Sequence, residues 1–456
     1  MRIDLAFPMT LNEIQKAVGG IGNSDDRTVY AISTDTRTLL PGDLFVALHG
    51  ERNDGHRFLD TAATKGAVAC LAEAVGDSRI TVGNTHTALL ALAKHSLQAH
   101  RARVVAITGS VGKTSTKEAT AAALSPAFRV YKTEENENNE LGVAKSVLSR
   151  PSNAEVLVLE LGSNHPGEIA PLSQAIEPDV AILTAIGSAH IGAFGSKEAI
   201  LAEKACITEG MRGGCLILSK NDPLLASLSA PVPIRGVAIE EDADLVARGV
   251  FFSRFGTSYT ARWAEGERRI FLRGVGRPRV SASLLALSCA LHLGVPIAQA
   301  ADALFRMPPT EGRGAVHEAG GVLLIDDAYN ASPEAVEEGL LLLRSLGAKR
   351  RRIAVLGDML ELGEESAALH RKIGSLAARH ADALHAFGSY AEEIALGARE
   401  CGMPREEIGI HGDSEECKRA LLGSLSDGDA VLVKASHALG GESIVKAILG
   451  RGRRLH

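Results

Sequence analysis

The sequence has little of several features that would direct a protein toward large partners. Aromatic residues make up only 4% of the 456 residues, which leaves few rings on which the bases of a single-stranded nucleic acid could stack. The net charge of -6 does not favour broad binding to nucleic-acid phosphates. No apolar run approaches the roughly 18 residues that span a membrane, and the N-terminus lacks a signal-peptide pattern. We therefore expect a cytoplasmic protein that binds no nucleic acid and inserts into no membrane.

Cysteine is also sparse, and no C-x-x-C spacing is present. The six cysteines are Cys70, Cys206, Cys215, Cys289, Cys401 and Cys417. Scattered cysteines of this kind predict buried free thiols rather than a zinc site or a disulfide framework.

The length predicts about three domains at roughly 150 residues per domain. Apolar strand-like runs alternate with helical patterns, so we expect an α/β fold. The predicted parts are a small N-terminal α/β domain (residues 1–100), a central P-loop-type parallel-sheet ATPase domain (101–308) and a C-terminal Rossmann-like domain (309–456) with four or five parallel strands. In the last of these, Ser332 is a predicted helix N-cap and Pro333 the first helical residue.

A glycine-rich turn between a predicted strand and a predicted helix is the most distinctive segment. Residues 104–108 predict a buried strand, GSVG follows at 109–112, and Lys113 and Thr114 begin an alanine-rich helix. Such a turn presents backbone N–H groups to phosphate, with the lysine on the terminal phosphates and the threonine on Mg²⁺. The strict P-loop pattern needs a glycine where Ile107 stands, so only the shorter T-G-x-x-G-K-T-S form is matched. The alternative is a glycine turn that merely joins strand to helix.

Further polar positions could serve a nucleotide, although each has an ordinary structural alternative. Glu160 ends an apolar strand at the expected edge of the phosphate loop and could bind a metal, but strand-end glutamates are often simply exposed. Asn138 and Asn139 lie in a polar loop, where asparagines often bind their own backbone. His190 follows the next strand and Lys204 lies in a predicted helix; a lone histidine is more often structural, and a helix lysine is usually solvated.

The N-terminal block contains a compact polar cluster before the turn at Pro41-Gly42-Asp43. Asp35, Thr36 and Arg37 form this cluster. Taken alone, it is more simply a solvated loop with an Asp–Arg pair than a binding site.

Together, these motifs resemble those of the Mur ligases, ATP-dependent enzymes that build the stem peptide of peptidoglycan. The similarity extends over nearly the whole chain in the family's order. The matching segments are DTRTLLPGDLFVALHGERNDGHRF, TGSVGKTSTKE, TEENENNELG, ELGSNHPGEI, SAHIGAFGS, GRG, IDDAYNASP, VLGDMLELGEES with His370, and VLVKAS. The motifs look like those of the branch that joins D-alanyl-D-alanine to UDP-N-acetylmuramoyl-tripeptide for cell-wall synthesis. The resemblance implies small-molecule substrates, and we expect a monomer.

The resemblance implies ATP and Mg²⁺ as cofactors and a role for each matching position. ATP would be held by Gly109, Ser110, Val111, Gly112, Lys113, Thr114 and Ser115, and from the last domain by Arg313, Asp326, Tyr329 and Asn330. The metal ligands would be Thr114, Glu160, His190 and Lys204, and the catalytic group would be Lys113, His190, Lys204, Asn138 and Asn139. The UDP-sugar site would contain Ser33, Asp35, Thr36, Arg37, Asp54 and His56. Lys204 would act as a carbamate, which is an anionic oxygen ligand that forms only on a locally neutral lysine.

The implied chemistry is amide ligation through an acyl phosphate. A carboxylate acylates amines poorly, so ATP phosphorylates it while cations neutralise the transferring phosphoryl group. The neutral amine then attacks, and phosphate leaves. Because the phosphate loop and Arg313 belong to different domains, we expect the site to assemble on domain closure, which excludes water.

Several positions depart from the family pattern. The family's H-N-x-x-N box, whose asparagines help to hold adenine, reads Pro278-Arg279-Val280-Ser281-Ala282, and its K-G-S-R reads Lys434-Ala435-Ser436-His437. Glu135 replaces a glycine, and Ala144-Lys145 replaces Pro-Leu. These departures leave open a paralogue that joins a different amine to a different carboxylate.

Two other classes of function are less consistent with the sequence. A nucleotide switch or simple ATPase would not require the flanking domains. A non-catalytic binding protein would have no physical need to keep Lys113, Thr114, Glu160, His190 and Lys204 together.

Overall fold

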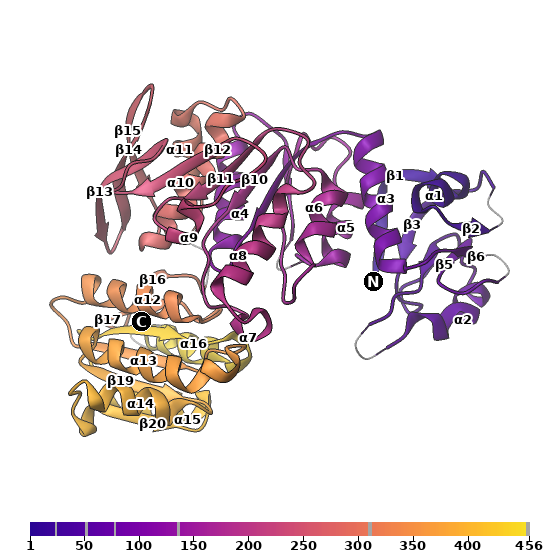
Figure 1. Ribbon diagram of the computed structural model, residues 1–456. Coiled ribbons are helices and arrows are strands. Elements are labelled where there is room, and N and C mark those ends of the chain that lie inside the picture. Colours follow the sequence, from indigo (N-terminus) through magenta and orange to yellow (C-terminus); the bar gives the residue numbers. More distant parts are fainter. Residues whose placement is uncertain (23–24, 51–52, 77–78, 135–136, 309–311, 453–456) are drawn as a thin grey trace.

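The computed structural model describes all residues except 23–24, 51–52, 77–78, 135–136, 309–311 and 453–456. Its strands form three separate sheets, and Figure 1 shows the central α/β unit between an N-terminal unit and a C-terminal unit. The predicted α/β fold with three domains is therefore confirmed, whereas the exact boundaries at 100 and 308 stay predictions. In the described parts of the chain, no helix combines the length and apolar character needed to cross a bilayer.

The N-terminal sheet has the strand order β1-β3-β4-β5-β6-β2. Its strands are β1 (Arg2–Thr10), β2 (Ile21–Gly22), β3 (Thr28–Ser33), β4 (Leu44–Val46), β5 (Ala69–Ala72) and β6 (Arg79–Thr81). The helices of this part are α1 (Leu11–Val18), the 3-10 helix η1 (Gly55–Phe58), α2 (Leu59–Thr64) and α3 (Thr85–Ala99). The side chains of Thr10 and Glu13 cap the start of α1 reciprocally, which fixes where the helix begins.

The central sheet has the order β15-β14-β13-β12-β11-β10-β7-β9-β8. Its strands are β7 (Arg103–Thr108), β8 (Val130–Lys132), β9 (Val156–Glu160), β10 (Val180–Leu183), β11 (Cys215–Ser219), β12 (Ile234–Ile239), β13 (Leu245–Ser253), β14 (Gly256–Trp263) and β15 (Gly266–Leu272). The helices are α4 (Lys113–Leu124), α5 (Glu140–Leu148), α6 (Ile169–Ile176), α7 (Ile191–Phe194), α8 (Lys197–Ala205), η2 (Cys206–Thr208), α9 (Pro223–Ala226), α10 (Arg277–His292) and α11 (Ile297–Arg306). The sheet is parallel from β8 to β13, and β14 and β15 add an antiparallel edge that the sequence patterns had not distinguished.

The C-terminal sheet has the order β16-β17-β21-β18-β19-β20. Its strands are β16 (Ala315–Ala319), β17 (Val322–Asp326), β18 (Arg352–Gly357), β19 (Ala383–Phe387), β20 (Ile408–His411) and β21 (Ala430–Lys434). The helices are α12 (Pro333–Leu346), η3 (Gly363–Glu365), α13 (Ser366–His380), α14 (Ala391–Glu400), η4 (Arg405–Glu407), α15 (Ser414–Ser424), η5 (His437–Leu439) and α16 (Gly441–Gly452). Five of these strands are parallel, and Ser332 caps α12 with Pro333 at its start, as predicted.

Middle strands of the central and C-terminal sheets, such as β9 and β17, are buried on both faces, whereas edge strands such as β15 are partly exposed. In β7, Val104 and Ala106 face a core that also includes residues of α3, α5 and α6, whereas Val105 and Ile107 face a core shared with α4 and α10. Because neighbouring side chains of a strand point to opposite faces, a continuous apolar run such as β7 is what such a sheet requires. The carboxyl end of β7 therefore lies at a defined edge of the central sheet, and the glycine-rich turn follows the strand there.

A buried arginine joins the N-terminal helix α3 to the central domain. Arg150 is 2% exposed, and its guanidinium donates hydrogen bonds to the carbonyl oxygens of Ser96 (3.0 Å) and His100 (2.8 Å) at the end of α3. It also stacks over Phe7 at 4.8 Å. Burial lowers the pKa of Arg150 to about 10, so the charge is kept at neutral pH and is satisfied by α3.

Candidate functional site

The glycine-rich turn is held open by two backbone conformations and one hydroxyl. Gly109 has φ 145° and Gly112 has φ 87°, values that L side chains rarely adopt. A Cβ on Gly109 would lie 2.1 Å from Oγ1 of Thr184. That hydroxyl donates to the carbonyl oxygen of Val111 at 2.6 Å. Because Gly112 offers no side chain to cap α4, the first N–H groups of that helix face the turn and can receive an anion.

Lys113 folds back over the turn. Its Nζ donates to the carbonyl oxygen of Gly109 at 2.9 Å. Burial lowers the pKa of Lys113, the carboxylate of Glu160 opposes that shift, and the charge of Arg313 reinforces it. Lys113, Glu160 and Arg313 therefore lie close enough to influence one another, although Arg313 comes from the C-terminal domain.

Glu160, at the end of β9, is buried rather than exposed. Its side chain is 2% exposed, and its Oε1 accepts a hydrogen bond from Nδ2 of Asn138 at 3.0 Å. Its Oε2 is buried without a hydrogen-bond partner among the described residues, and Nζ of Lys117 lies 3.7 Å away. A buried carboxylate oxygen in this state fits a Mg²⁺ ligand, because hard cations bind carboxylate oxygens.

The sequence interpretation missed Lys117, which follows Lys113 by one helical turn on α4. Lys117 is 1% exposed, and burial lowers its pKa while Glu160 opposes the shift. A signal was available: positions i and i+4 of a helix lie on the same face, so Lys117 had to lie beside Lys113.

His190 and Lys204 lie at the same edge of the central sheet as Lys113, whose charge influences both. Burial lowers the pKa of Lys204 to about 7, and the charge of Lys113 reinforces the shift. Its Nζ donates to the hydroxyl of Ser163 at 2.6 Å. Burial also lowers the pKa of His190; Glu361 opposes the shift, and Lys113 and Lys204 reinforce it. A lysine whose pKa lies near 7 has a substantial fraction of the free amine that carbamylation requires at neutral pH.

The two asparagines of the polar loop have different positions. Asn138 contacts Glu160, as described above. Asn139 is the N-cap of α5, and its Oδ1 accepts from the backbone N–H of Gly142 at 2.9 Å. The ordinary interpretation, in which the side chain binds its own backbone, therefore describes Asn139, and its catalytic role stays a prediction. Glu135 lies outside the described residues.

Arg313 and Tyr329 are residues of the C-terminal domain that belong to the predicted nucleotide site. The guanidinium of Arg313 stacks over the ring of Tyr329 at 4.1 Å. Asp326 accepts from the backbone N–H of Gly312 at 2.9 Å and so holds the turn from which Arg313 projects. The oxygen of the Asn330 side chain accepts from the N–H of Ala331, within its own loop. Asp326 thus has a local structural partner in addition to its predicted nucleotide role.

The departures from the family pattern occupy defined places. Lys434 is 2% exposed and donates to Asp327 (2.5 Å) and to the carbonyl oxygen of Asn330 (3.0 Å), which fixes the loop after β17. His437, where the family has arginine, packs against Tyr329 with ring centres 5.4 Å apart. Arg279 replaces an asparagine of the adenine box; it is 9% exposed and donates to the carbonyl oxygen of Pro308 at 3.2 Å.

The predicted UDP-sugar residues form two local clusters in the N-terminal domain. Arg37 donates to Asp35 at 2.6 Å and lowers the pKa of that carboxyl, while Thr36 accepts from Lys65 at 2.7 Å through its carbonyl oxygen. Ser33 donates to the carbonyl oxygen of Asp35 at 2.9 Å.

The second cluster lies at η1. Asp54 accepts from the backbone N–H of His56 at 2.9 Å, and Nε2 of that histidine accepts from the N–H of Glu73 at 3.1 Å. Among the described residues, no hydrogen bond or ion pair joins either cluster to the phosphate loop. The structure thus assembles the nucleotide residues and leaves the UDP-sugar residues apart.

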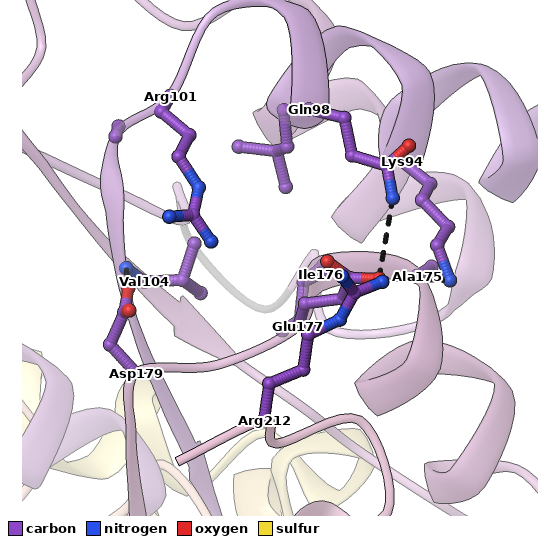
Figure 2. A pocket seen from close by; sticks show the side chains of 11 residues that line it. Lys94, Gln98, Arg101, Val104, Ala175, Ile176, Glu177, Asp179 and Arg212 are labelled. Atoms are coloured by element: carbon purple, nitrogen blue, oxygen red, sulfur yellow. Dashed lines mark hydrogen bonds and ion pairs between the residues drawn. The ribbon is translucent and has the colours of Figure 1, made fainter. Parts of the chain in front are cut away.

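A polar cavity of about 210 Å³ lies at the opposite end of the central sheet, and it is not the nucleotide site (Figure 2). Val104, at the start of β7, and Asp179, just before β10, line it, whereas the phosphate loop follows the end of β7. Glu177 there pairs with Lys94 of α3 at 3.1 Å and with Arg212 at 2.5 Å. The pair with Lys94 connects α3 to the central domain, whereas the pair with Arg212 lies within that domain.

Comparison with known proteins agrees with this arrangement. Three family models match: "Mur ligase family, catalytic domain" over residues 28–135, "Mur ligase middle domain" over 107–290, and "Mur ligase, glutamate ligase domain" over 312–437. The UDP-N-acetylmuramoyl-tripeptide--D-alanyl-D-alanine ligase of Bacillus subtilis is 33% identical, over 93% of this chain and 94% of that protein. The chain belongs to the Mur ligase family. The ligase of the same name from Escherichia coli is 31% identical to this Mur ligase, over 97% of this chain and 99% of that protein.

Solved structures of Mur ligases are similar to this chain over nearly its whole length. MurF from Acinetobacter baumannii superposes with a TM-score of 0.88 at 26% identity and covers 98% of this chain and 100% of that chain. MurF from Thermotoga maritima, solved in complex with ADP, superposes with a TM-score of 0.84 at 29% identity over 93% and 98% of the two chains. This Mur ligase therefore shares the three-part architecture of those proteins.

Proposed function

We propose that this Mur ligase joins D-alanyl-D-alanine to UDP-N-acetylmuramoyl-tripeptide, with hydrolysis of ATP to ADP, through an acyl phosphate. The observation that carries the proposal is Glu160, whose buried Oε2 has no hydrogen bond among the described residues and lies beside the phosphate loop. The names of the relatives support the same substrates. The ADP complex of the Thermotoga maritima relative supports the nucleotide.

The ATP phosphates would bind the turn from Gly109 to Gly112 and the start of α4, with Lys113 on the terminal phosphates. Thr114, Glu160, His190 and a carbamylated Lys204 would hold Mg²⁺. When bound, Mg²⁺ neutralises charge on the phosphoryl group that is transferred. Arg313 would approach the same group from the C-terminal domain, where its stack on Tyr329 limits its orientations.

The carboxylate of the UDP-linked substrate would attack the γ-phosphorus of ATP and form the acyl phosphate, while the bond from that phosphorus to the bridging oxygen breaks and ADP leaves. The neutral amine of the dipeptide would then attack the acyl carbon, and inorganic phosphate would leave. Contacts between the central and C-terminal domains would exclude water from the intermediate: Glu334 of α12 accepts from the hydroxyl of Ser188 at 2.9 Å and from Lys197 at 2.8 Å. Within this scheme, residues 1–100 would hold the UDP-sugar, 101–308 ATP, and 309–456 the amine and part of the nucleotide.

Carbamylation of Lys204 can be tested directly. We expect protein equilibrated with ¹³C-bicarbonate to show one carbamate resonance that is absent from Lys204→Arg. Lys197→Arg is the matched control, because Lys197 is a lysine of the same helix that pairs with Glu334 at 2.8 Å. Full activity of Lys204→Arg, or no carbamate in the native protein, would contradict this role.

The function itself is tested by phosphate release from Mg·ATP. UDP-N-acetylmuramoyl-tripeptide and D-alanyl-D-alanine are supplied separately and together, and the product mass is recorded. We expect release only with both substrates, together with the pentapeptide product. No release from folded protein that binds ATP would reject the assignment.

The alternative is a Mur ligase of the same mechanism that joins a different amine to a different carboxylate. His437, in place of the family's arginine, favours it, because an imidazole lacks the planar fork of N–H donors with which arginine binds a carboxylate bidentately. Phosphate release with other amines, but not with D-alanyl-D-alanine, would support this alternative. The proposed substrates are small molecules, a UDP-linked sugar peptide and a dipeptide or other amine, and we expect the chain to act as a monomer in the cytoplasm, where ATP is supplied.

A further inference from the structure

A group of three potential metal ligands lies at the edge of the C-terminal sheet, outside the site described above. His385 is on β19, His411 ends the edge strand β20, and Cys417 is on α15. One potential ligand atom from each lies within 4.8 Å of the other two. The three residues come from three different elements, which explains why cysteine spacing alone indicated no such site.

The register of the two strands brings the imidazoles together. His385 pairs with Gly409 across the β19–β20 ladder, and Phe387 pairs with His411. Nδ1 of His385 lies 3.0 Å from Nε2 of His411, and the rings stack with centres 5.3 Å apart. Gly409 makes this possible, because a Cβ there would lie 2.7 Å from Nε2 of His411 and 2.9 Å from Nδ1 of His385.

Cys417 approaches the pair from the helix that covers this face. It is 0% exposed and packs in the core of α15 and α16, while His411 is 8% exposed and His385 is partly exposed. The cluster is therefore buried on the side of Cys417 and partly open to solvent at His385.

The charges near the cluster are few. Arg351, which influences His385, is neutralised by Glu407 at 2.7 Å. Glu416, which influences His411 and Cys417, accepts from the backbone N–H of Gly412 at 2.8 Å. The surroundings therefore tolerate a divalent cation held by one thiolate and two imidazoles.

We propose that His385, His411 and Cys417 form a zinc site with three protein ligands that joins the edge strand β20 to helix α15. Zinc takes cysteine sulfur at about 2.3 Å and histidine nitrogen at about 2.0–2.1 Å in a tetrahedron, which puts the ligand atoms roughly 3.3–3.6 Å apart. The ligand atoms lie within 4.8 Å of one another, so some separations shorten by up to about 1 Å when the metal binds. A solvent molecule on the open side of His385 completes the four ligands.

The proton balance of binding is simple. The thiol of Cys417 loses its proton to solvent when the sulfur–zinc bond forms. Nδ1 of His385 and Nε2 of His411 share one proton. When both nitrogens bind zinc, that proton moves to the other nitrogen of the ring that carried it, so neither imidazole changes its charge. Zinc binding therefore releases one proton, so zinc affinity rises with pH.

Cobalt(II) spectroscopy tests the site, because a thiolate bound to cobalt gives a charge-transfer absorption that oxygen and nitrogen ligands do not. The full chain, freed of metals by a chelator, is titrated with cobalt(II) in excess Mg²⁺, which occupies the proposed nucleotide site. We expect one equivalent of the charge-transfer absorption, abolished by adding zinc. Cys417→Ser should remove it, Cys401→Ser on the exposed cysteine should retain it, and Gly409→Ala should weaken cobalt binding about tenfold or more.

A second measurement needs no variant and covers the case in which Cys417→Ser does not fold. X-ray absorption at the zinc edge of the native holoprotein should show one sulfur and two imidazole neighbours. The proposal is overturned by the absence of the charge-transfer absorption in folded native protein at saturating cobalt, by its persistence in Cys417→Ser, or by a zinc shell of oxygen and nitrogen alone.

Discussion

Nδ1 of His190 in the central domain lies 2.6 Å from a carboxylate oxygen of Glu361 in the C-terminal domain. Both residues have left-handed backbones, with φ 61° and φ 65°, conformations that non-glycine residues adopt at a cost of about 1–3 kcal/mol each. Beside them, a Cβ on Gly363 would lie 2.8 Å from Cα of Gly192, so the backbones of the two domains touch. Two strained residues and a backbone contact thus mark a point where the central and C-terminal domains meet.

Glu361→Gln should weaken this contact modestly, because ion pairs with an exposed partner contribute up to about 1 kcal/mol and the Glu361 side chain is 64% exposed. We expect KM for ATP to rise about two- to fivefold, as measured by steady-state phosphate release. The matched control is Glu364→Gln, a neighbouring charge change on η3. Equal effects of the two variants would show that the His190 contact is unimportant.

Lys117→Met should lower the free energy of unfolding by about 3 kcal/mol, because it removes the buried cation that pairs with the carboxylate of Glu160. Denaturant titration of the ligand-free protein measures this. Adding Glu160→Gln to Lys117→Met should restore part of the loss. The control is Lys132→Met, whose ammonium pairs with Glu118 but is 43% exposed. If both lysine variants lose the same stability, the buried pair is not the cause.

Arg313→Lys should lower kcat about 100-fold while changing KM for ATP little, because lysine keeps the charge but lacks the fork that can clamp a phosphoryl group. Tyr329→Leu should give a smaller loss, since it removes only the stack at 4.1 Å. Arg254 also stacks on an aromatic ring, Phe255 at 4.7 Å, so Arg254→Lys is the control and should leave kcat unchanged. A loss confined to KM would argue against transition-state contact by Arg313.

His370 should contribute to acid sensitivity. Its Nε2 accepts from the N–H of Met359 at 2.8 Å, and burial lowers its pKa below the ordinary 6.5. As the pH falls below 6.5 the unfolded chain takes up a proton that the folded chain resists, so stability falls by at most about 1.4 kcal/mol per pH unit.

His370→Phe keeps the packing against Tyr390, whose ring centre lies 4.4 Å away, but loses the hydrogen-bond acceptor. Its stability at pH 8 should be about 1–3 kcal/mol lower, and the loss between pH 6.5 and 5 should be smaller than in the native chain. Denaturant titrations across this range check both effects. His165→Gln, at a side chain 72% exposed, is the control, and an unchanged pH dependence in His370→Phe would contradict the prediction.

The sequence by itself determined the features that depend on neighbours along the chain. The glycine turn at 109–112, the cap at Ser332 and the β-branched run of β7 are contiguous signals, because backbone geometry and capping act over a few residues. The ordered motifs extended this to the family, and the comparisons confirmed it. The cysteines are free, as expected, although Cys401 is exposed and Cys206 only partly buried.

Only the tertiary structure decided which distant residues meet. The pairing of Lys117 with Glu160, the contact of His190 with Glu361 and the approach of Cys417 to two histidines each join different elements. These contacts depend on strand order, register and domain closure, which are set by packing of whole sheets and helices. The residues on either side of a polar residue in the sequence do not identify its distant partner. Burial and charge pairing depend on the assembled core rather than on the neighbouring sequence.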